Sequence, residues 1–189
     1  GVTDELLGLV DKAARREPVA PTLAALRERH RKAAAELIGA AAEPLLAEIG
    51  RDLEDIDAIL KAVALVRASS ERSRDLVAGY GEIWLARILS AFLARELGAG
   101  RAVQFHNARV VRGVEQGEMG RVVVWEESRT KLQAVLAPGW EGIAVITGFI
   151  ACDRQGLPTT LGRNGSDYSA SIFGSLFDAS HVHIWTDVR

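Results

Sequence analysis

The residues best suited to chemistry lie in one glycine-rich loop, Leu161-Gly162-Arg163-Asn164-Gly165-Ser166-Asp167-Tyr168-Ser169. Gly162 and Gly165 permit backbone angles or close approaches that a Cβ would obstruct, and Ser166 and Asp167 are N-cap candidates for a helix that follows. The positive end of such a helix favours a carboxylate or phosphate, and Arg163 can hold either group with two hydrogen bonds. The loop therefore predicts an anion site, although a polar strand-to-helix connection with a solvated arginine has the same composition.

The overall composition excludes several other kinds of function. The chain has 189 residues, 48% of them hydrophobic and 25% charged, as expected for a soluble globular domain with a full core. A net charge of −2 gives no basic footprint for nucleic acid, and no apolar run approaches the roughly 18 residues that cross a membrane. The single cysteine, Cys152, cannot form an internal disulfide, so we expect a core residue and, by default, a cytoplasmic protein.

The first hundred residues are predicted to form a helical scaffold. Apolar residues recur at helical spacing over residues 3–17, 21–37, 43–49 and 53–66. Thr3 is expected to cap the first helix, and Ser69-Ser70 the helix after the fourth segment. The stretch Gly79-Tyr80-Gly81-Glu82 then precedes a strongly apolar helix. Glu82 is therefore placed at a helix start, where the helix dipole stabilises a carboxylate.

After Gly100 the sequence changes to short β-rich runs. Strands are predicted over 102–105, 109–111, 122–125 and 182–185, and 142–151 is the candidate for a central strand covered on both faces. Helices are predicted over 128–136 and 166–178, and turn residues over 153–158 predict a hairpin that leads into the glycine loop. Strands that alternate with helices indicate a parallel α/β sheet, and ligands collect at the carboxyl ends of such strands.

No metal site is predicted. The histidines, His30, His106, His181 and His183, have no metal-ligand spacing with Cys152 or with one another. The sequence also lacks a GxxxxGK[ST] loop and the combined glycine and catalytic loops of protein kinases. If the chain takes part in phosphate transfer, it uses neither of those architectures.

Four motifs, in this order, resemble the catalytic domain of aspartate kinases, which are members of the amino acid kinase family. They are Gly1-Val2-Thr3-Asp4, Gly81-Glu82, the glycine loop over 161–169, and Ile184-Trp185-Thr186-Asp187-Val188. The resemblance implies an α/β fold, a three-layer αβα sandwich around a mainly parallel sheet, with a helix-rich N-terminal half. Residues 1–189 would be a partial amino acid kinase domain, mainly helical over 1–100 and sheet-forming over 101–189, where the substrate and nucleotide loops lie.

The resemblance further implies an activity: transfer of a phosphoryl group from ATP, with Mg²⁺, to the side-chain carboxylate of L-aspartate. The aspartate-binding residues would be Thr3, Glu82, Arg163 and Ser166. Glu82 would pair with the ammonium group of aspartate, and Arg163 with a carboxylate. Asp167 would be the catalytic residue that orients the lysine of the family, and Thr186 and Asp187 would begin the ATP-binding segment.

The chain also departs from the family pattern. The family opens with a strand and a K-F-G-G-T-S loop whose lysine contacts ATP, and continues with a D-P-R nucleotide loop and paired regulatory domains. We therefore expect a piece of a longer chain, inactive by itself, whose parent forms a homo-oligomer through those regulatory domains. Three alternatives stay open: an amino acid kinase for glutamate, acetylglutamate or a nucleotide, a noncatalytic regulatory subunit of the same fold, and a helical interaction module.

Overall fold

The structure is a computed structural model that describes residues 1–111, 113–117, 120–162 and 164–185. The contacts divide the chain into two compact units. Unit 1 comprises Gly1–Phe105 and Gly142–Val145, and unit 2 comprises His106–Glu141 and Ile146–Arg189.

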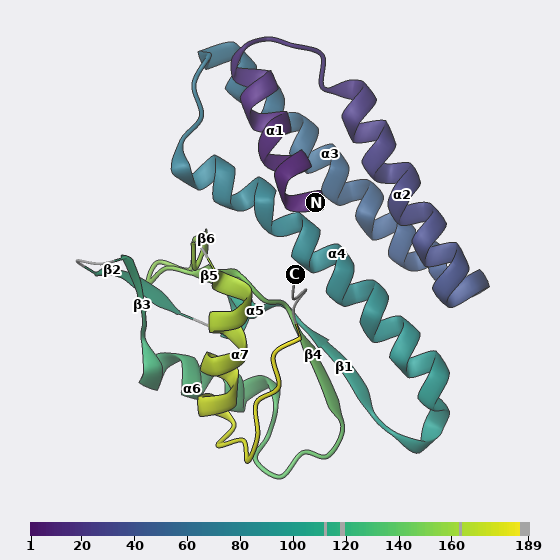
Figure 1. The fold of residues 1–189 in the computed structure, drawn as a ribbon, viewed down its shortest axis with the longest axis vertical. Coiled ribbons are helices and arrows are strands. Elements are labelled where there is room, and N and C mark those ends of the chain that lie inside the picture. The colour runs from purple at the N-terminus through teal and green to yellow at the C-terminus, as the bar shows by residue number, and fades with distance from the viewer. Residues whose placement is uncertain (112, 118–119, 163, 186–189) are drawn as a thin grey trace. The chain divides into compact units, whose positions relative to one another are not determined.

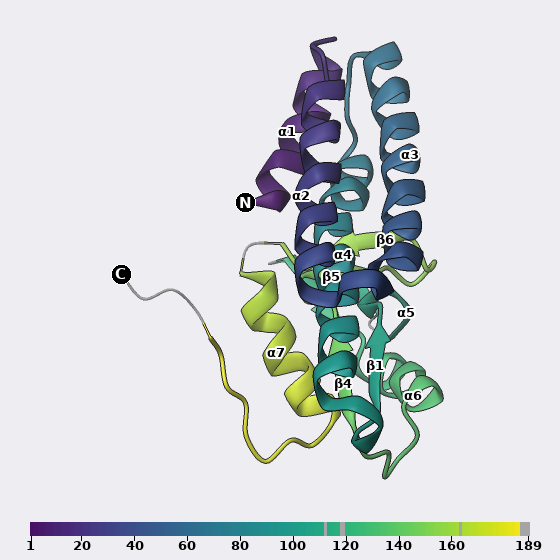
Figure 2. The ribbon, with the colours of Figure 1, turned by 90° about the vertical axis from the view of Figure 1, so that its right-hand side faces the viewer.

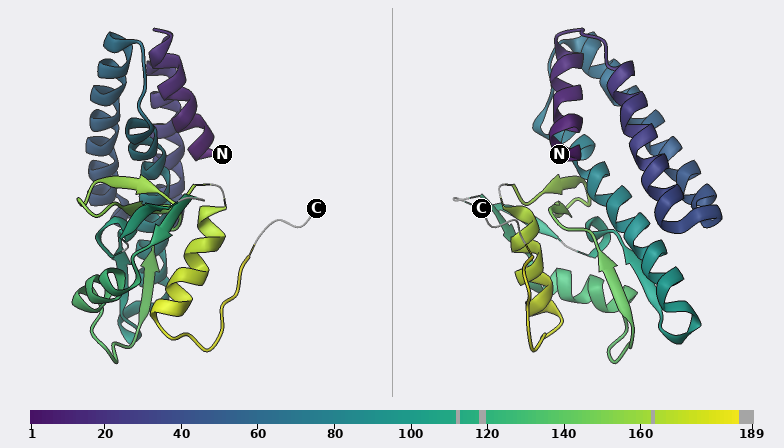
Figure 3. Two further views of the ribbon diagram at one scale, coloured as in Figure 1. Left: turned by 90° about the vertical axis from the view of Figure 1, so that its left-hand side faces the viewer. Right: turned by 45° about the vertical axis from the view of Figure 1, so that its right-hand side comes forward.

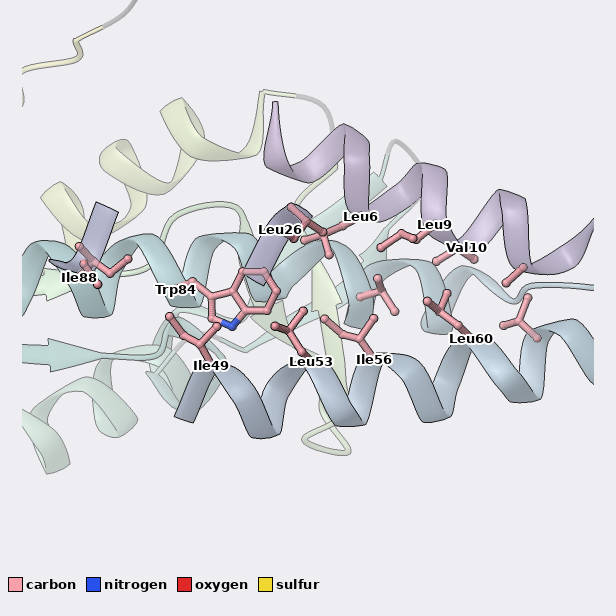
Figure 4. Close-up of a cluster of buried hydrophobic side chains, with 14 of the residues drawn as sticks. Leu6, Leu9, Val10, Leu26, Ile49, Leu53, Ile56, Leu60, Trp84 and Ile88 are labelled. Carbon is pink, nitrogen blue, oxygen red and sulfur yellow. The ribbon is translucent and has the colours of Figure 1, made fainter. Parts of the chain in front are cut away.

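Helices make up most of unit 1. They are α1 (Val2–Ala14), α2 (Ala20–Ile38), the 3-10 turn η1 (Gly39–Ala42), α3 (Glu43–Val66), α4 (Glu71–Leu97) and the 3-10 turn η2 (Gly98–Gly100). Both α1 and α2 pack against α3 and α4, as Figures 1 and 2 show. Their apolar faces meet in one core (Figure 4), which includes Leu6, Leu9, Val10, Leu26, Ile49, Leu53, Ile56, Leu60, Trp84 and Ile88.

Two helices of unit 1, α3 and α4, are longer than the sequence predicts. Helix α3 continues through Gly50, and α4 continues through Gly79 and Gly81, so the predicted breaks at these glycines are wrong. A glycine inside a helix costs about 1 kcal/mol, which burial of one core side chain more than offsets. The cap at Ser70 is confirmed, because its side chain accepts the Ser73 N–H at 3.1 Å. Thr3 is not a cap, since α1 starts at Val2 with Gly1 in the capping position.

The helix over Glu71–Gly100 is long and apolar enough to cross a membrane, by length and composition alone. Its Trp84 and Ile88 belong to the core of unit 1, and the core helix of a folded domain passes the same test. A single helix of this kind is weak evidence for a membrane span.

One strand pair is parallel. Strand β1 (Val103–His106) pairs with β4 (Ile143–Ile146). The Ile143 N–H donates to the Ala102 carbonyl at 2.8 Å, and the Thr147 N–H donates to the His106 carbonyl at 3.2 Å. From the first of these hydrogen bonds to the second, the residue number rises from 102 to 106 on one strand and from 143 to 147 on the other. The two strands therefore run in the same direction.

Unit 2 combines hairpins with helices (Figure 3). Its elements are α5 (Ala108–Val111), β2 (Val114–Gly117), β3 (Gly120–Val123), α6 (Trp125–Val135), β5 (Ile150–Cys152), β6 (Pro158–Thr160) and α7 (Gly165–Leu176). Strands β2 and β3 form one antiparallel pair, and β5 and β6 form another with Ala151 opposite Thr159. The hairpin predicted around 153–158 is therefore confirmed. A parallel bridge joins Gly113 to Cys152.

Three predicted strands differ from the structure. Residues 109–111 lie in α5, where the Asn107 side chain accepts the Arg109 N–H at 3.0 Å and so favours a helical start. The run over 142–151 is two strands, because the chain turns at Phe149, whose φ is 60°. Residues 182–185 are assigned no strand, and Trp185 is 91% exposed. A segment with alternating apolar residues forms a strand only where a neighbouring strand supplies hydrogen bonds.

Candidate active site

The glycine loop ends at the N-terminus of α7. Asn164, with a φ of 58°, occupies the capping position, so the prediction that Ser166 or Asp167 caps the helix is wrong. Both lie in the first helical turn and are exposed to solvent. The prediction for the two glycines is confirmed: Gly162 has a φ of +77°, and a Cβ on Gly165 would lie 2.9 Å from the Phe149 ring. The loop thus presents Ser166 and Asp167 at the positive end of a helix.

A second backbone segment lies against this helix start. A Cβ on Gly148 would lie 3.6 Å from the Cα of Ser166, and the Phe149 N–H donates to the Ser169 hydroxyl at 2.9 Å. Sequence reasoning did not assign Gly148, Phe149 or Ser169 to the site. The available signal was Gly148 itself, because a glycine inside an apolar strand run often marks a bend or a close backbone approach.

In unit 1, another glycine lies at the contact between the two helices that carry Thr3 and Glu82. A Cβ on Gly81 would lie 3.0 Å from Val2 Cγ1 and 3.4 Å from Leu6 Cδ1, so the missing side chain lets α1 approach α4 closely. Val2 precedes Thr3, and Gly81 precedes Glu82. The first turn of α1 and the middle of α4 therefore meet at Val2 and Gly81, the sequence neighbours of Thr3 and Glu82.

Glu82 lies in the middle of α4, not at a helix start as predicted. The helix dipole therefore does not explain its position, because that field fades beyond the first turn. The Glu82 side chain is partly buried, and this burial raises the pKa of its carboxyl group above the ordinary value. A partly buried carboxylate of this kind gains from a cationic partner, such as an ammonium group.

Hydrogen bonds fix α4 against α3 close to Glu82. The Trp84 indole N–H donates to Asp52 at 2.9 Å, and Arg87 donates to the same carboxylate oxygen at 2.8 Å. Arg87 also forms an ion pair with Glu48 at 3.2 Å. Because Trp84 is fully buried, these contacts restrict the rotation of α4 and therefore the direction in which Glu82 points.

Three predicted site residues, Arg163, Thr186 and Asp187, lie outside the described residues. Of the others, Thr3 and Glu82 lie on two helices of unit 1 that pack on one another through Val2 and Gly81, and Ser166 and Asp167 lie in the first turn of α7 in unit 2.

Within the described part of the chain, no three His, Cys, Asp or Glu side chains form a group that could hold a metal ion. The rings of His181 and His183 stack on one another with centroids 6.2 Å apart. Cys152 is 2% exposed, as predicted for a core residue, and burial raises the pKa of its thiol. Its position in β5 makes it part of the packing of unit 2.

Known proteins resemble this chain in sequence. The sequence model of the amino acid kinase family matches residues 2–189. The chloroplastic bifunctional aspartokinase/homoserine dehydrogenase 2 of Arabidopsis thaliana is 36% identical over 190 residues, which are 99% of this chain and 20% of that protein. Lysine-sensitive aspartokinase 3 of Escherichia coli is 36% identical over 143 residues, or 75% of this chain and 30% of that protein. The chain thus spans about a fifth to a third of these relatives.

Solved structures show the same fold. The crystal structure of E. coli aspartokinase III in complex with lysine and aspartate has a TM-score of 0.83 and 27% identity, and covers 100% of this chain and 41% of that chain. The complex of that enzyme with aspartate and ADP has a TM-score of 0.81. The predicted α/β fold with a helix-rich N-terminal half is therefore confirmed, and the chain belongs to the amino acid kinase family.

Proposed function

We propose that the full-length protein containing this chain is an aspartate kinase. It transfers the terminal phosphoryl group of ATP to the side-chain carboxylate of L-aspartate and produces 4-phospho-L-aspartate, the first step toward lysine, threonine and methionine. The observation that carries this proposal is the glycine loop at the start of α7, which exposes Ser166 and Asp167 next to Gly165, where a Cβ would lie 2.9 Å from the Phe149 ring. The aspartokinase names of the relatives support aspartate as the substrate.

In this proposal unit 1 recognises the amino group of aspartate. Glu82 accepts hydrogen bonds from the ammonium, and its raised pKa then falls because a positive charge favours the ionised carboxylate. Thr3, in the first turn of the neighbouring α1, supplies a hydroxyl to the same substrate. Gly81 is needed because a side chain there would separate these two helices.

The glycine loop binds the carboxylate of aspartate and the phosphoryl group that is transferred to it. Arg163 holds a carboxylate of aspartate with two parallel N–H donors, and Ser166 donates a hydrogen bond from the first turn of α7. The transition state spreads negative charge over the transferring phosphoryl group, so catalysis depends on fixed positive groups around it. Asp167 orients the lysine that supplies one such charge, which the family carries in a K-F-G-G loop.

ATP would bind beside this loop, with Thr186 and Asp187 beginning its binding segment. The positive end of α7 fits a phosphate group. A magnesium ion that arrives with ATP is held mainly by phosphates and one or two carboxylates.

A hydroxamate assay tests the proposal on the purified full-length protein. ATP, Mg²⁺ and hydroxylamine are supplied with L-aspartate, L-glutamate or N-acetylglutamate, and the acyl hydroxamate is measured. We expect product with aspartate, at a turnover of about 1–1,000 s⁻¹, and none with the other two acids. Product with glutamate or acetylglutamate would assign a different amino acid kinase. A folded protein that binds aspartate without forming product would be a regulatory subunit.

We also propose that the full-length protein is cytoplasmic and forms a homo-oligomer through regulatory domains. The relatives include both chloroplastic plant enzymes and bacterial ones, so the compartment depends on the source. Cell fractionation tests the first statement, and light scattering of the purified protein tests the second. A membrane-bound or chloroplastic protein would contradict the first statement, and a monomeric protein would contradict the second.

A further inference from the structure

A strained turn separates β4 from β5 in unit 2. The Ile150 N–H donates to the Gly148 carbonyl at 2.5 Å, which closes a three-residue γ-turn with Phe149 at its centre. Phe149 has a φ of 60°, a backbone conformation that residues other than glycine rarely adopt. Such a conformation persists only where neighbouring contacts hold it in place.

The Ser169 hydroxyl provides one of those contacts. It accepts the Phe149 N–H at 2.9 Å and donates to the Gly165 carbonyl at 2.6 Å, and Ser169 is only 3% exposed. On the other side of the turn, the Leu161 N–H donates to the Phe149 carbonyl at 2.7 Å. The turn is thus held from α7 through a side chain and from the residue after β6 through the backbone.

The turn at Phe149 also supports the start of α7. The Phe149 ring lies 2.9 Å from the position that a Cβ of Gly165 would take, and Gly148 lies against the backbone of Ser166. Ser166 and Asp167 are exposed on this same helical turn, whereas Ser169 is buried beneath it. Ser169 therefore acts on the turn and does not face the solvent side on which a ligand would bind.

We propose that Ser169 is a positioning residue: its hydroxyl fastens the Gly148–Phe149 turn to the first turn of α7 and thereby fixes Ser166 and Asp167 for catalysis. This inference rests on the proposed function, which assigns Ser166 and Asp167 to the reaction. Removing the hydroxyl leaves the Phe149 N–H without this acceptor and lets the strained turn relax. Misplacing catalytic groups by about 1 Å can lower a rate by about 100-fold.

Three variants of the full-length protein test this inference. Ser169→Ala removes both hydrogen bonds, and Ser169→Thr keeps a hydroxyl in a helix where threonine can still bond the carbonyl four residues back. Ser171→Ala is the matched control, since its exposed hydroxyl lies 3.5 Å from the Asp167 carbonyl on the same helix. We expect Ser169→Ala to lower kcat by about 10- to 100-fold with a smaller change in the ATP KM, and the other two variants to stay near wild type.

Hydrogen exchange of the 147–152 peptide provides a readout that does not depend on activity. Exchange at Phe149 should quicken in Ser169→Ala and stay at the wild-type rate in Ser169→Thr and Ser171→Ala. Faster exchange with unchanged kcat would make Ser169 merely structural and overturn the proposal, as would unchanged exchange. If wild-type protein phosphorylates no aspartate, the proposed function fails, whereas the exchange result still decides whether Ser169 holds the turn.

Discussion

Replacement of Glu82 by glutamine tests the aspartate-binding proposal because it removes a charge and keeps the shape of the side chain. Burial raises the Glu82 pKa from its ordinary value of 4.5, so the folded protein holds this proton more tightly than the unfolded chain does. The resulting contribution to stability is fully present at a pH below the Glu82 pKa of the unfolded chain. It is lost as the pH rises through the Glu82 pKa of the folded protein. At neutral pH, which lies above the unfolded pKa, Glu82 therefore destabilises the ligand-free fold.

Two opposite effects of Glu82→Gln follow from this burial. Without ligand, the variant should melt at a higher temperature than wild type near pH 7, and the difference should shrink as the pH falls toward 4.5 and be absent below that value. With ligand, the amide lacks the charge that pairs with the ammonium of aspartate. A charge-assisted hydrogen bond contributes about 1.5–3 kcal/mol, so the aspartate KM should rise roughly 10- to 100-fold while the ATP KM changes little.

Calorimetry at both pH values and steady-state kinetics measure these effects on the full-length protein. Glu36→Gln is the control, because Glu36 is an exposed glutamate on α2 in the same unit, and it should change neither quantity. An unchanged aspartate KM would remove Glu82 from the substrate site. A stability difference that is equal at both pH values would show that ionisation of a buried carboxylate is not its cause.

Three further substitutions test the glycine loop. Arg163→Lys keeps the charge but loses the planar pair of donors, so the aspartate KM should rise about 10- to 100-fold; a rise in the ATP KM instead would assign Arg163 to the nucleotide. Asp167→Asn should lower kcat far more than it raises the aspartate KM, and because Asn164 is the N-cap, a lost cap cannot explain the result. An unchanged kcat would exclude Asp167 from catalysis. Gly165→Ala places a Cβ 2.9 Å from the Phe149 ring, so thermal melts should show a loss of about 1–3 kcal/mol, and wild-type stability would show that the loop relaxes.

The sequence predicted what depends on local patterns. Helical spacing located α1 and α2 within a few residues, and turn residues located the hairpin between β5 and β6. The left-handed conformation of Gly162 also followed, because a glycine in a loop is most often there for its backbone freedom.

The sequence failed where tertiary contacts decide the local structure. Gly81 was interpreted as a helix break, yet it lies inside α4 because α1 packs on it through Val2. Phe149 was placed in a continuous strand, since nothing about a phenylalanine predicts a positive φ. Its turn is stabilised by Ser169, which lies 20 residues further along the chain. Contacts between residues so far apart in sequence leave no local pattern from which to predict them.

The packing of unit 1 also explains how the direction of the Glu82 side chain is fixed in the middle of a helix. Residues two positions apart on an α-helix point about 200° from one another, so Glu82 projects nearly opposite to Trp84. The Trp84 indole is fully buried and donates to Asp52 of α3, which fixes the rotation of α4. Glu82 is consequently directed away from α3 by a contact that it does not itself make. The helix must be continuous between Glu82 and Trp84 for this effect, because a break between them would uncouple the direction of Glu82 from the contact of Trp84 with α3.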